Sequence, residues 1–176
     1  MRIVAAWFAA VVLLAASGQV QAKNEPVTEE ERVVVQVFEA PDYTKDQIFT
    51  AARMWIAQNF ESAKAVIEYE SKDDGTLIGN GNIPYTCSGG FACGIRAGAW
   101  RVGFTMKVEA KDGRFRLTFT NVRHQLPPYS NMGTSLPARD EPITQRDDMD
   151  QAKTDLLAFG PQIVASLDGP NATETW

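Results

Sequence analysis

Between Thr44 and Gly81 the spacing of apolar residues changes from that of a helix to that of a strand, and this change constrains the fold most. Thr44 and Gln47 have the spacing of a capping box, in which the hydroxyl accepts from the amide of residue 47 and the glutamine side chain reaches back. The apolar stripe that follows consists of Ile48, Ala52, Trp55, Ile56 and Phe60. The pattern predicts an amphipathic helix with Trp55 as an anchor of the core.

After this helix the apolar spacing shortens to two residues, which is typical of a strand. Ala65, Ile67 and Tyr69 are expected to share one face of that strand. Asp73-Asp74-Gly75 predicts a tight turn, because the glycine can adopt a positive φ. A second strand is predicted over residues 76–83, so the two strands form a hairpin.

The clearest strand covers residues 100–110, where apolar side chains alternate with polar ones. A turn centred on Asp112-Gly113 leads to another strand, whose Phe115, Leu117 and Phe119 are expected to face the core. The opposite, polar face of these strands is a candidate interaction face, carrying Arg101, Lys107, Arg114, Arg116 and Thr118, interleaved with Glu68 and Glu109. The other interpretation of this face is a solvated surface with cross-strand ion pairs.

Residues 33–39 are rich in β-branched side chains and predict the first strand, and residues 147–167 predict a second helix. Gly160-Pro161 is expected to kink or split that helix. The resulting order is β-α-β-β-β-β-α. Because each helix has one apolar stripe and the sheet one apolar face, we expect an α+β fold in which two helices cover one face of a curved antiparallel sheet.

Residues 1–22 have the charged start, apolar middle and small-residue end of a secretory signal peptide, with cleavage expected after Ala22. The alternative is a membrane anchor, but the apolar run is short for one, so no integral span is expected after removal of the signal. We therefore expect a secreted or periplasmic protein. Residues 23–32 are expected to form a flexible leader, residues 33–168 a single domain, and residues 169–176 a tail.

The chain has 17 Lys and Arg against 22 Asp and Glu, giving a formal net charge of −5. This balance disfavours nucleic acid as a partner, because binding phosphates requires clustered cations. The motifs of the common nucleotide-binding, zinc-hydrolase and serine-hydrolase classes are missing from the sequence. No cofactor, metal or catalytic residue is therefore predicted.

Both cysteines, Cys87 and Cys93, lie in a glycine-rich stretch at residues 84–99 that has no periodicity. In an oxidising compartment the expected state is a structural disulfide worth about 2–3 kcal/mol in the chain-entropy model. A redox pair or a metal site is the alternative, but the spacing is not C-x-x-C and the chain has one histidine.

Residues 123–146 also lack periodicity and contain four prolines, so they predict a long loop. His124 at its start is a formal candidate for a general base, but no nucleophile accompanies it in the sequence. We expect it to be an isolated surface side chain. Pro127-Pro128-Tyr129 is expected either to pack over the sheet or to contact a partner.

The segment KDQIFTAARMWIAQNFESAKAVIEYESKDDGTLIGNG, together with KDGRFRLTFTNV downstream, resembles a secreted bacterial family known as domain of unknown function 4468. The resemblance covers roughly residues 33–167. It implies a TBP-like fold with the same β-α-β4-α order that the periodicity predicts independently. The family has no accepted active-site residues, so the resemblance transfers none, and a shared fold does not confer a function.

Three functions remain open from the sequence. The first is a non-catalytic binding module of the cell envelope that contacts an unknown envelope protein or small molecule through the polar sheet face and the loops. The second is an enzyme of unrecognised type. The third is a carrier with an apolar ligand between sheet and helices, near Phe49, Met54, Trp100 and Tyr129. We favour the first and do not expect an enzyme.

Overall fold

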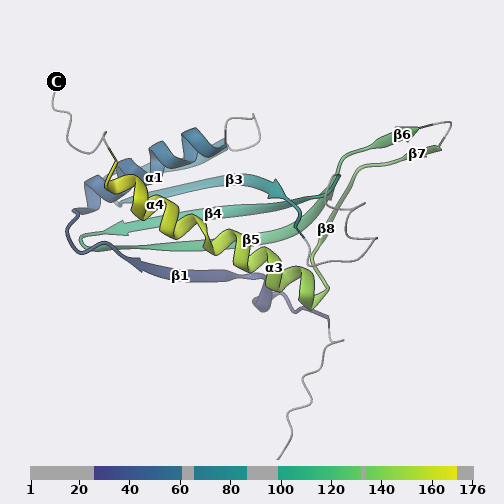
Figure 1. Ribbon diagram of the computed structural model, residues 1–176, viewed down its shortest axis with the longest axis horizontal. Coiled ribbons are helices and arrows are strands. Elements are labelled where there is room, and N and C mark those ends of the chain that lie inside the picture. The colour runs from purple at the N-terminus through teal and green to yellow at the C-terminus, as the bar shows by residue number, and fades with distance from the viewer. Residues whose placement is uncertain (1–25, 61–65, 87–98, 132–133, 170–176) are drawn as a thin grey trace, which may run out of the picture.

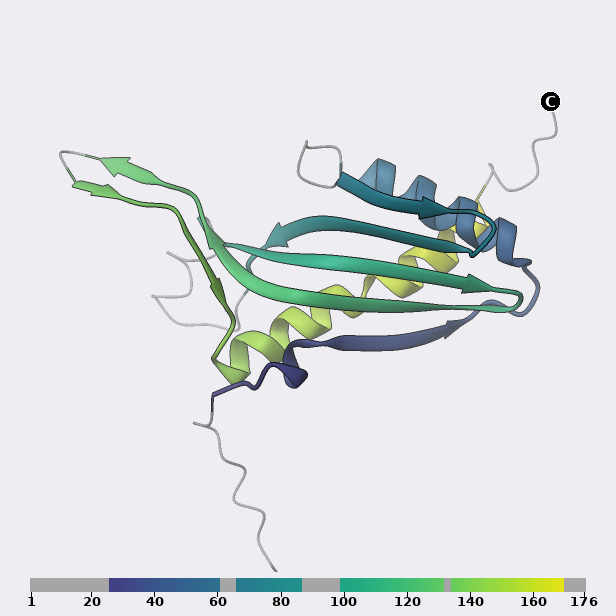
Figure 2. The same cartoon turned by 180° about the vertical axis from the view of Figure 1, so that it is seen from behind.

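The computed structural model describes residues 26–60, 66–86, 99–131 and 134–169. Its main sheet is antiparallel, with strand order β1-β5-β4-β3-β2, and β8 pairs with β5 outside this path. Three helices cover one face of the sheet and leave the other face open (Figures 1 and 2). The helices are α1 (Lys45–Asn59), α3 (Arg146–Leu157) and α4 (Phe159–Leu167), and a short 3-10 helix, η1, spans Glu30–Arg32. The predicted α+β class is confirmed.

The predicted strands are present, and short additional strands follow them. The strands are β1 (Val34–Glu39), β2 (Val66–Ser71), β3 (Thr76–Pro84), β4 (Arg101–Lys111), β5 (Arg114–Leu126), β6 (Tyr129–Asn131), β7 (Thr134–Leu136) and β8 (Arg139–Pro142). The alternating residues of β4 and β5 that were expected to face the core are buried. Against them α1 buries Ile48, Phe49, Ala52, Trp55 and Ile56.

Phe159, at the start of α4, lies at the centre of the aromatic core. Its ring centroid is 4.9 Å from that of Trp55, and 5.7 Å from that of Phe119. Phe60 and Phe104 also contact it edge-on, at 5.7 and 5.8 Å. These aromatic contacts join α1, α4 and the sheet, and each contributes beyond the area that it buries.

The second predicted helix is split into α3 and α4 at Ala158, close to the predicted break. Pro161 lies in the first turn of α4, where its missing N–H costs nothing. Gly160 is required for another reason: a Cβ at this position would lie 2.1 Å from the ring of Phe38 on β1. The glycine therefore allows α4 to approach the edge strand closely.

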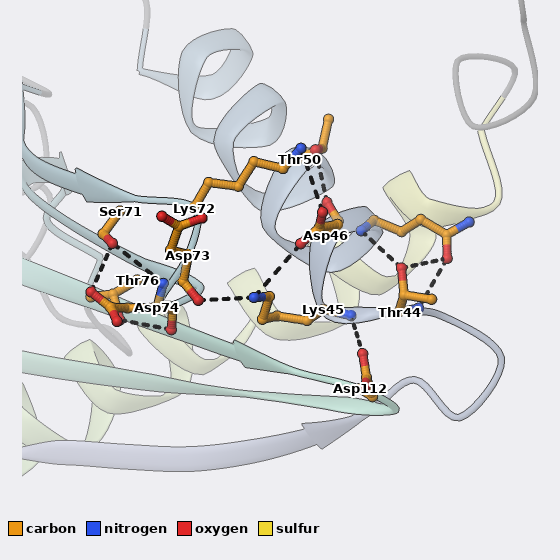
Figure 3. Close-up of polar contacts among 11 residues, drawn as sticks. Thr44, Lys45, Asp46, Thr50, Ser71, Lys72, Asp73, Asp74, Thr76 and Asp112 are labelled. Atoms are coloured by element: carbon orange, nitrogen blue, oxygen red, sulfur yellow. Dashed lines mark hydrogen bonds and ion pairs between the residues drawn. The ribbon is translucent and has the colours of Figure 1, made fainter.

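Two hairpin turns of the sheet meet the N-terminus of α1 (Figure 3). The predicted capping box of Thr44 and Gln47 is present. The Lys45 backbone N–H donates to Oδ1 of Asp112 in the β4–β5 turn at 2.7 Å, and Lys45 Nζ donates to the carbonyl oxygen of Asp73 in the β2–β3 turn at 2.9 Å. Lys45 therefore joins the capped N-terminus of α1 to both of the predicted turns.

The expected face of Tyr69 was wrong. The register between β2 and β3 shifts between Ile67 and Tyr69, so Glu68 occupies a bulge. Ile67 still packs against the core, but Tyr69 pairs with Ile78 and is 47 % exposed on the open face. A one-residue slip is enough to move a side chain across the sheet.

The expectation of a long loop over residues 123–146 was also wrong. Strand β5 continues to Leu126, and β8 pairs with its last four residues. Strands β6 and β7 form a separate ladder that projects away from the main sheet (Figures 1 and 2). All four residues of β8 are exposed, so backbone pairing forms this strand without an apolar period that the sequence could display.

Part of the expected leader packs against the domain. Val27 is 4 % exposed, and its N–H donates to the carbonyl oxygen of Thr144 at 2.9 Å. Arg146 at the start of α3 pairs with Glu31 at 2.9 Å. The contacts of the domain therefore begin before residue 33.

Several predictions concern residues outside the described ranges. They are the signal peptide with cleavage after Ala22, the Cys87–Cys93 disulfide, and the part of the tail from residue 170 onward. Within the described ranges, no helix combines the length and apolar character that crossing a bilayer requires.

Candidate interaction surface

The face of the sheet opposite the helices carries both apolar and charged side chains. On edge strand β1, Val35 and Val37 are 53 % and 48 % exposed, and Val33 immediately before the strand is also exposed. Tyr69 lies on the opposite edge strand, β2. The register places Val35 opposite Thr118 and Val37 opposite Arg116, so the valines continue the rows of the predicted interaction face. We call these side chains, with the five predicted ones, the open face.

All five predicted residues lie on this face. The ladder aligns Thr118 with Lys107, Arg116 with Glu109, and Arg114 with Lys111, on the side opposite the buried residues. Arg101 lies near the far end of β4, opposite Pro84, and its Nε donates to Oδ1 of Asn82 at 3.0 Å. The sequence therefore placed these side chains on the correct face, but it missed the valines and Tyr69 as part of the same surface.

Glu109 neutralises two of the cations. Its Oε1 lies 3.0 Å from Lys107 Nζ, and its Oε2 lies 2.6 Å from an Arg116 nitrogen. Partial burial acts to raise the pKa of the Glu109 carboxyl, but the hydrogen bonds from Lys107 and Arg116 outweigh it and hold the pKa below its usual value. In the described part of the chain, Arg101 and Arg114 have no carboxylate partner within ion-pair distance.

A polar network crosses the strands at the middle of the face. Asn80 on β3 accepts from the Thr105 hydroxyl at 2.6 Å and donates to Glu68 at 2.5 Å. This network joins the side chains of Thr105, Asn80 and Glu68 to one another within the sheet itself. The exposed apolar groups therefore lie toward the two edges, and the polar groups lie between them.

His124 is not the isolated surface side chain that the sequence suggested. It is 7 % exposed, and its Nε2 lies 3.8 Å from Oδ2 of Asp148 on α3. The Tyr85 hydroxyl donates to Oδ1 of the same carboxylate at 2.6 Å, and the Trp100 ring contacts the imidazole edge-on at 4.9 Å. This cluster connects the residue that follows β3 with β5 and α3, so it attaches the helix to the sheet.

The reason for this error is a bulge at Asn121. Its φ is 55°, and the β4–β5 register shifts between Gly103 and Thr105. Up to Phe119 the odd-numbered residues of β5 face the core, whereas after Asn121 the even-numbered residues do. The change brings His124 under α3. An asparagine, which tolerates a left-handed backbone, was the one local signal in the sequence.

The cavity that the structure records between α1 and the sheet is too small for a ligand. This cavity beside α1, lined by Ile56, Phe60, Phe104 and Met106 among others, holds about 10 Å³. Ligand sites are typically about 300–1,000 Å³. Phe49 fills the core, whereas Met54 is exposed and lines a separate cavity of about 300 Å³ between α1 and the end of α4. No group of three or more potential metal ligands occurs among the described residues.

A family model described as "Domain of unknown function (DUF4468) with TBP-like fold" matches residues 35–125, just over half of the chain. The chain belongs to this family. The match covers the strands of the main sheet from β1 to β5 and the first helix, so it includes the open face. The resemblance inferred from the sequence is therefore confirmed.

Two solved structures have the same fold. A DUF4468 family protein from Bacteroides ovatus superposes with a TM-score of 0.53 at 12% identity, covering 88% of this chain and 95% of that one. A TBP-like protein from Parabacteroides distasonis superposes with a TM-score of 0.51 at 12% identity, covering 76% of this chain and 92% of the other. No curated protein matches the chain. At such identities the likeness establishes the TBP-like fold alone.

Proposed function

We propose that this DUF4468 domain is a non-catalytic binding module of the cell envelope that contacts a protein partner through its open face. The observation that carries the proposal is the exposure of Val35 and Val37 on a sheet face that no helix covers. Contiguous exposed apolar groups with charged neighbours are typical of protein contact sites.

The edge position of the valines strengthens the proposal. Strand β1 is the last strand of the main sheet, and along Val34–Glu39 the structure describes pairing with β5 alone. Its other edge presents backbone donors and acceptors to an added strand of a partner. No lysine or proline protects this strand, although exposed edges commonly carry them.

The charges of the open face favour an acidic partner segment. Arg101 and Arg114 point to this face without carboxylate partners in the described part of the chain, while Glu109 already neutralises Lys107 and Arg116. Such rim charges mainly speed association and fix orientation. Apolar contact at the valines then supplies most of the affinity.

The envelope location rests on residues 1–22, whose composition is that of an export signal. The non-catalytic assignment rests on the burial of the His124–Asp148–Tyr85 cluster, which connects secondary structure elements. Measuring the intact mass of the protein recovered from the envelope fraction tests the export part. We expect a chain that begins at Lys23, and a chain that retains Met1 would indicate an anchor instead.

The binding part is tested by capture from an envelope extract with the chain from Lys23 onward. The Val35→Glu/Val37→Glu double variant places two charges on the open face, and the Thr154→Glu/Gln162→Glu variant places two charges on exposed positions of the helical side. We expect the first variant to lose the captured protein by about tenfold or more, and the second to retain it. Equal capture by both folded variants would contradict the proposal.

A further inference from the structure

A cavity of about 320 Å³ lies beside β5, between the part of β5 that pairs with β1 and the part that pairs with β8. Strand β1 pairs with β5 as far as Phe119, and β8 begins to pair with it at Arg123. Residues 120–122 of β5 therefore lie in a gap between two pairing partners, and the cavity opens at this gap. Arg32 and Val33 line it from the β1 side, and Pro142 lines it from β8.

The backbone of the cavity is strained at Asn121, which has a φ of 55°. It is the one non-glycine residue with a positive φ that the structure records in the described ranges. A left-handed backbone is uncommon for a residue other than glycine, and strained residues concentrate at sites of function. Here the strained residue also lines the cavity.

Arg123 has unsatisfied hydrogen-bonding capacity at the same place. Its Nη2 donates to Oδ1 of Asn121, and its Nη1 lies 3.4 Å from Oδ1 of Asp140. Its Nε is buried and has no hydrogen-bond acceptor in the described part of the chain. A buried donor without an acceptor is costly, whereas a guanidinium fork matches the two oxygens of a carboxylate.

The other residues that line the cavity determine which ligands it can bind. Arg32 adds a second guanidinium, of which Nη1 donates to the carbonyl oxygen of Val27 at 3.0 Å. Glu29 also lines the cavity, and its negative charge disfavours ligands with several anionic groups. Val33 and Pro142 contribute apolar surface. The combination favours a single carboxylate on a short apolar body.

We propose that this cavity binds a small monocarboxylate, with Arg123 as the anchoring residue and Arg32 as a second cation. The carboxylate replaces the Asn121 side chain at Nη2 of Arg123 and supplies the acceptor that Nε lacks. This inference goes beyond the proposed function, because it concerns a small molecule at the gap in the sheet and does not require the protein partner.

The test is a titration of the isotopically labelled chain, from Lys23 onward, with hexanoate, observed through the Nε–H signals of its arginines. We expect a saturable shift of the Arg123 signal that hexanol, which has the same chain length without the charge, does not produce. In a second readout, calorimetry on the Arg123→Lys variant should show at least tenfold weaker binding. Arg139→Lys, a matched change at an exposed arginine of β8, should bind like the parent chain.

Asn121→Gly provides a variant that should remain folded, since glycine adopts a positive φ without strain. We expect it to bind hexanoate at least as tightly as the parent chain, because it removes the competing amide. Absence of a saturable shift, an equal shift with hexanol, or unchanged binding in a folded Arg123→Lys variant would each overturn the proposal. Val35→Glu/Val37→Glu should retain hexanoate binding, and Arg123→Lys should retain capture of the protein partner, so the two proposals fail separately.

Discussion

The two faces of the main sheet are built from the same strands, but one is buried beneath the helices and the other is open. Phe115, Leu117 and Phe119 of β5 are fully buried beneath the helices, whereas Arg114, Arg116 and Thr118, one residue away from each, lie on the open face. The first set fills a close-packed core, whereas in the second set Arg116 pairs with Glu109 across the strands. Stability should therefore depend on one face and binding on the other.

Substitutions at two adjacent residues of β5 should show the largest difference in stability between the two faces. Phe119→Ala removes a ring that contacts both Phe104 and Phe159, and it should lower the free energy of unfolding by about 3–5 kcal/mol. The neighbouring change, Thr118→Ala, should alter it by less than about 0.5 kcal/mol. Urea unfolding of both variants measures the difference. Similar losses would show that the open face is also structural.

The approach of α4 to β1 gives the next largest effect. Gly160→Ala places a methyl group against the Phe38 ring and should cost about 1–3 kcal/mol by overpacking. In a Phe38→Ala background the same change should cost much less, because the space is then free. A double-mutant cycle measures this coupling. Additive effects would mean that the helix does not depend on this contact.

Two tyrosine–carboxylate pairs compare a buried contact with an exposed one. Tyr85→Phe removes a buried hydroxyl that donates to Asp148, and it should cost about 1–3 kcal/mol because the acceptor is charged. Tyr43→Phe removes the exposed contact with Asp168 and should cost less. Thermal unfolding of both variants tests the order. The reverse order would show that the His124 cluster does not attach α3 to the sheet.

The sequence predicted those regions in which local chemistry and burial agree. The cap at Thr44 and the turns at Gly75 and Gly113 each require particular residue types, and β4 alternates without interruption because one of its faces is buried. The same regularity placed all five charged or polar side chains of the open face correctly.

The predictions from sequence were wrong where hydrogen bonding between strands, and not an apolar pattern, determines which way a side chain faces. The bulges at Glu68 and Asn121 reverse the direction of the following side chains, which moved Tyr69 outward and His124 inward. Strand β8 is exposed along its whole length, so it has no apolar period. Cavities such as the one beside Arg123 arise from the meeting of separate strands, and no local pattern encodes them.

The smallest expected effect on stability concerns the ion pairs of the open face. Because the pKa of Glu109 is lowered in the folded state, its contribution is present above the pKa of the unfolded chain and is lost as pH falls through the folded value. Glu109→Gln should therefore cost about 1 kcal/mol or less at pH 7, and the difference should vanish in acid. Unfolding measured against pH tests this, and a difference that grows in acid would contradict the assignment.

The most direct test of the central claim is photo-crosslinking of the protein in cells. A photoreactive residue is placed at Val35 on the open face or at Lys153, an exposed position on α3. We expect illumination to link the Val35 variant to a discrete protein partner and the Lys153 variant to none. A partner captured equally from both positions, or from Lys153 alone, would contradict the account of the open face as the binding surface.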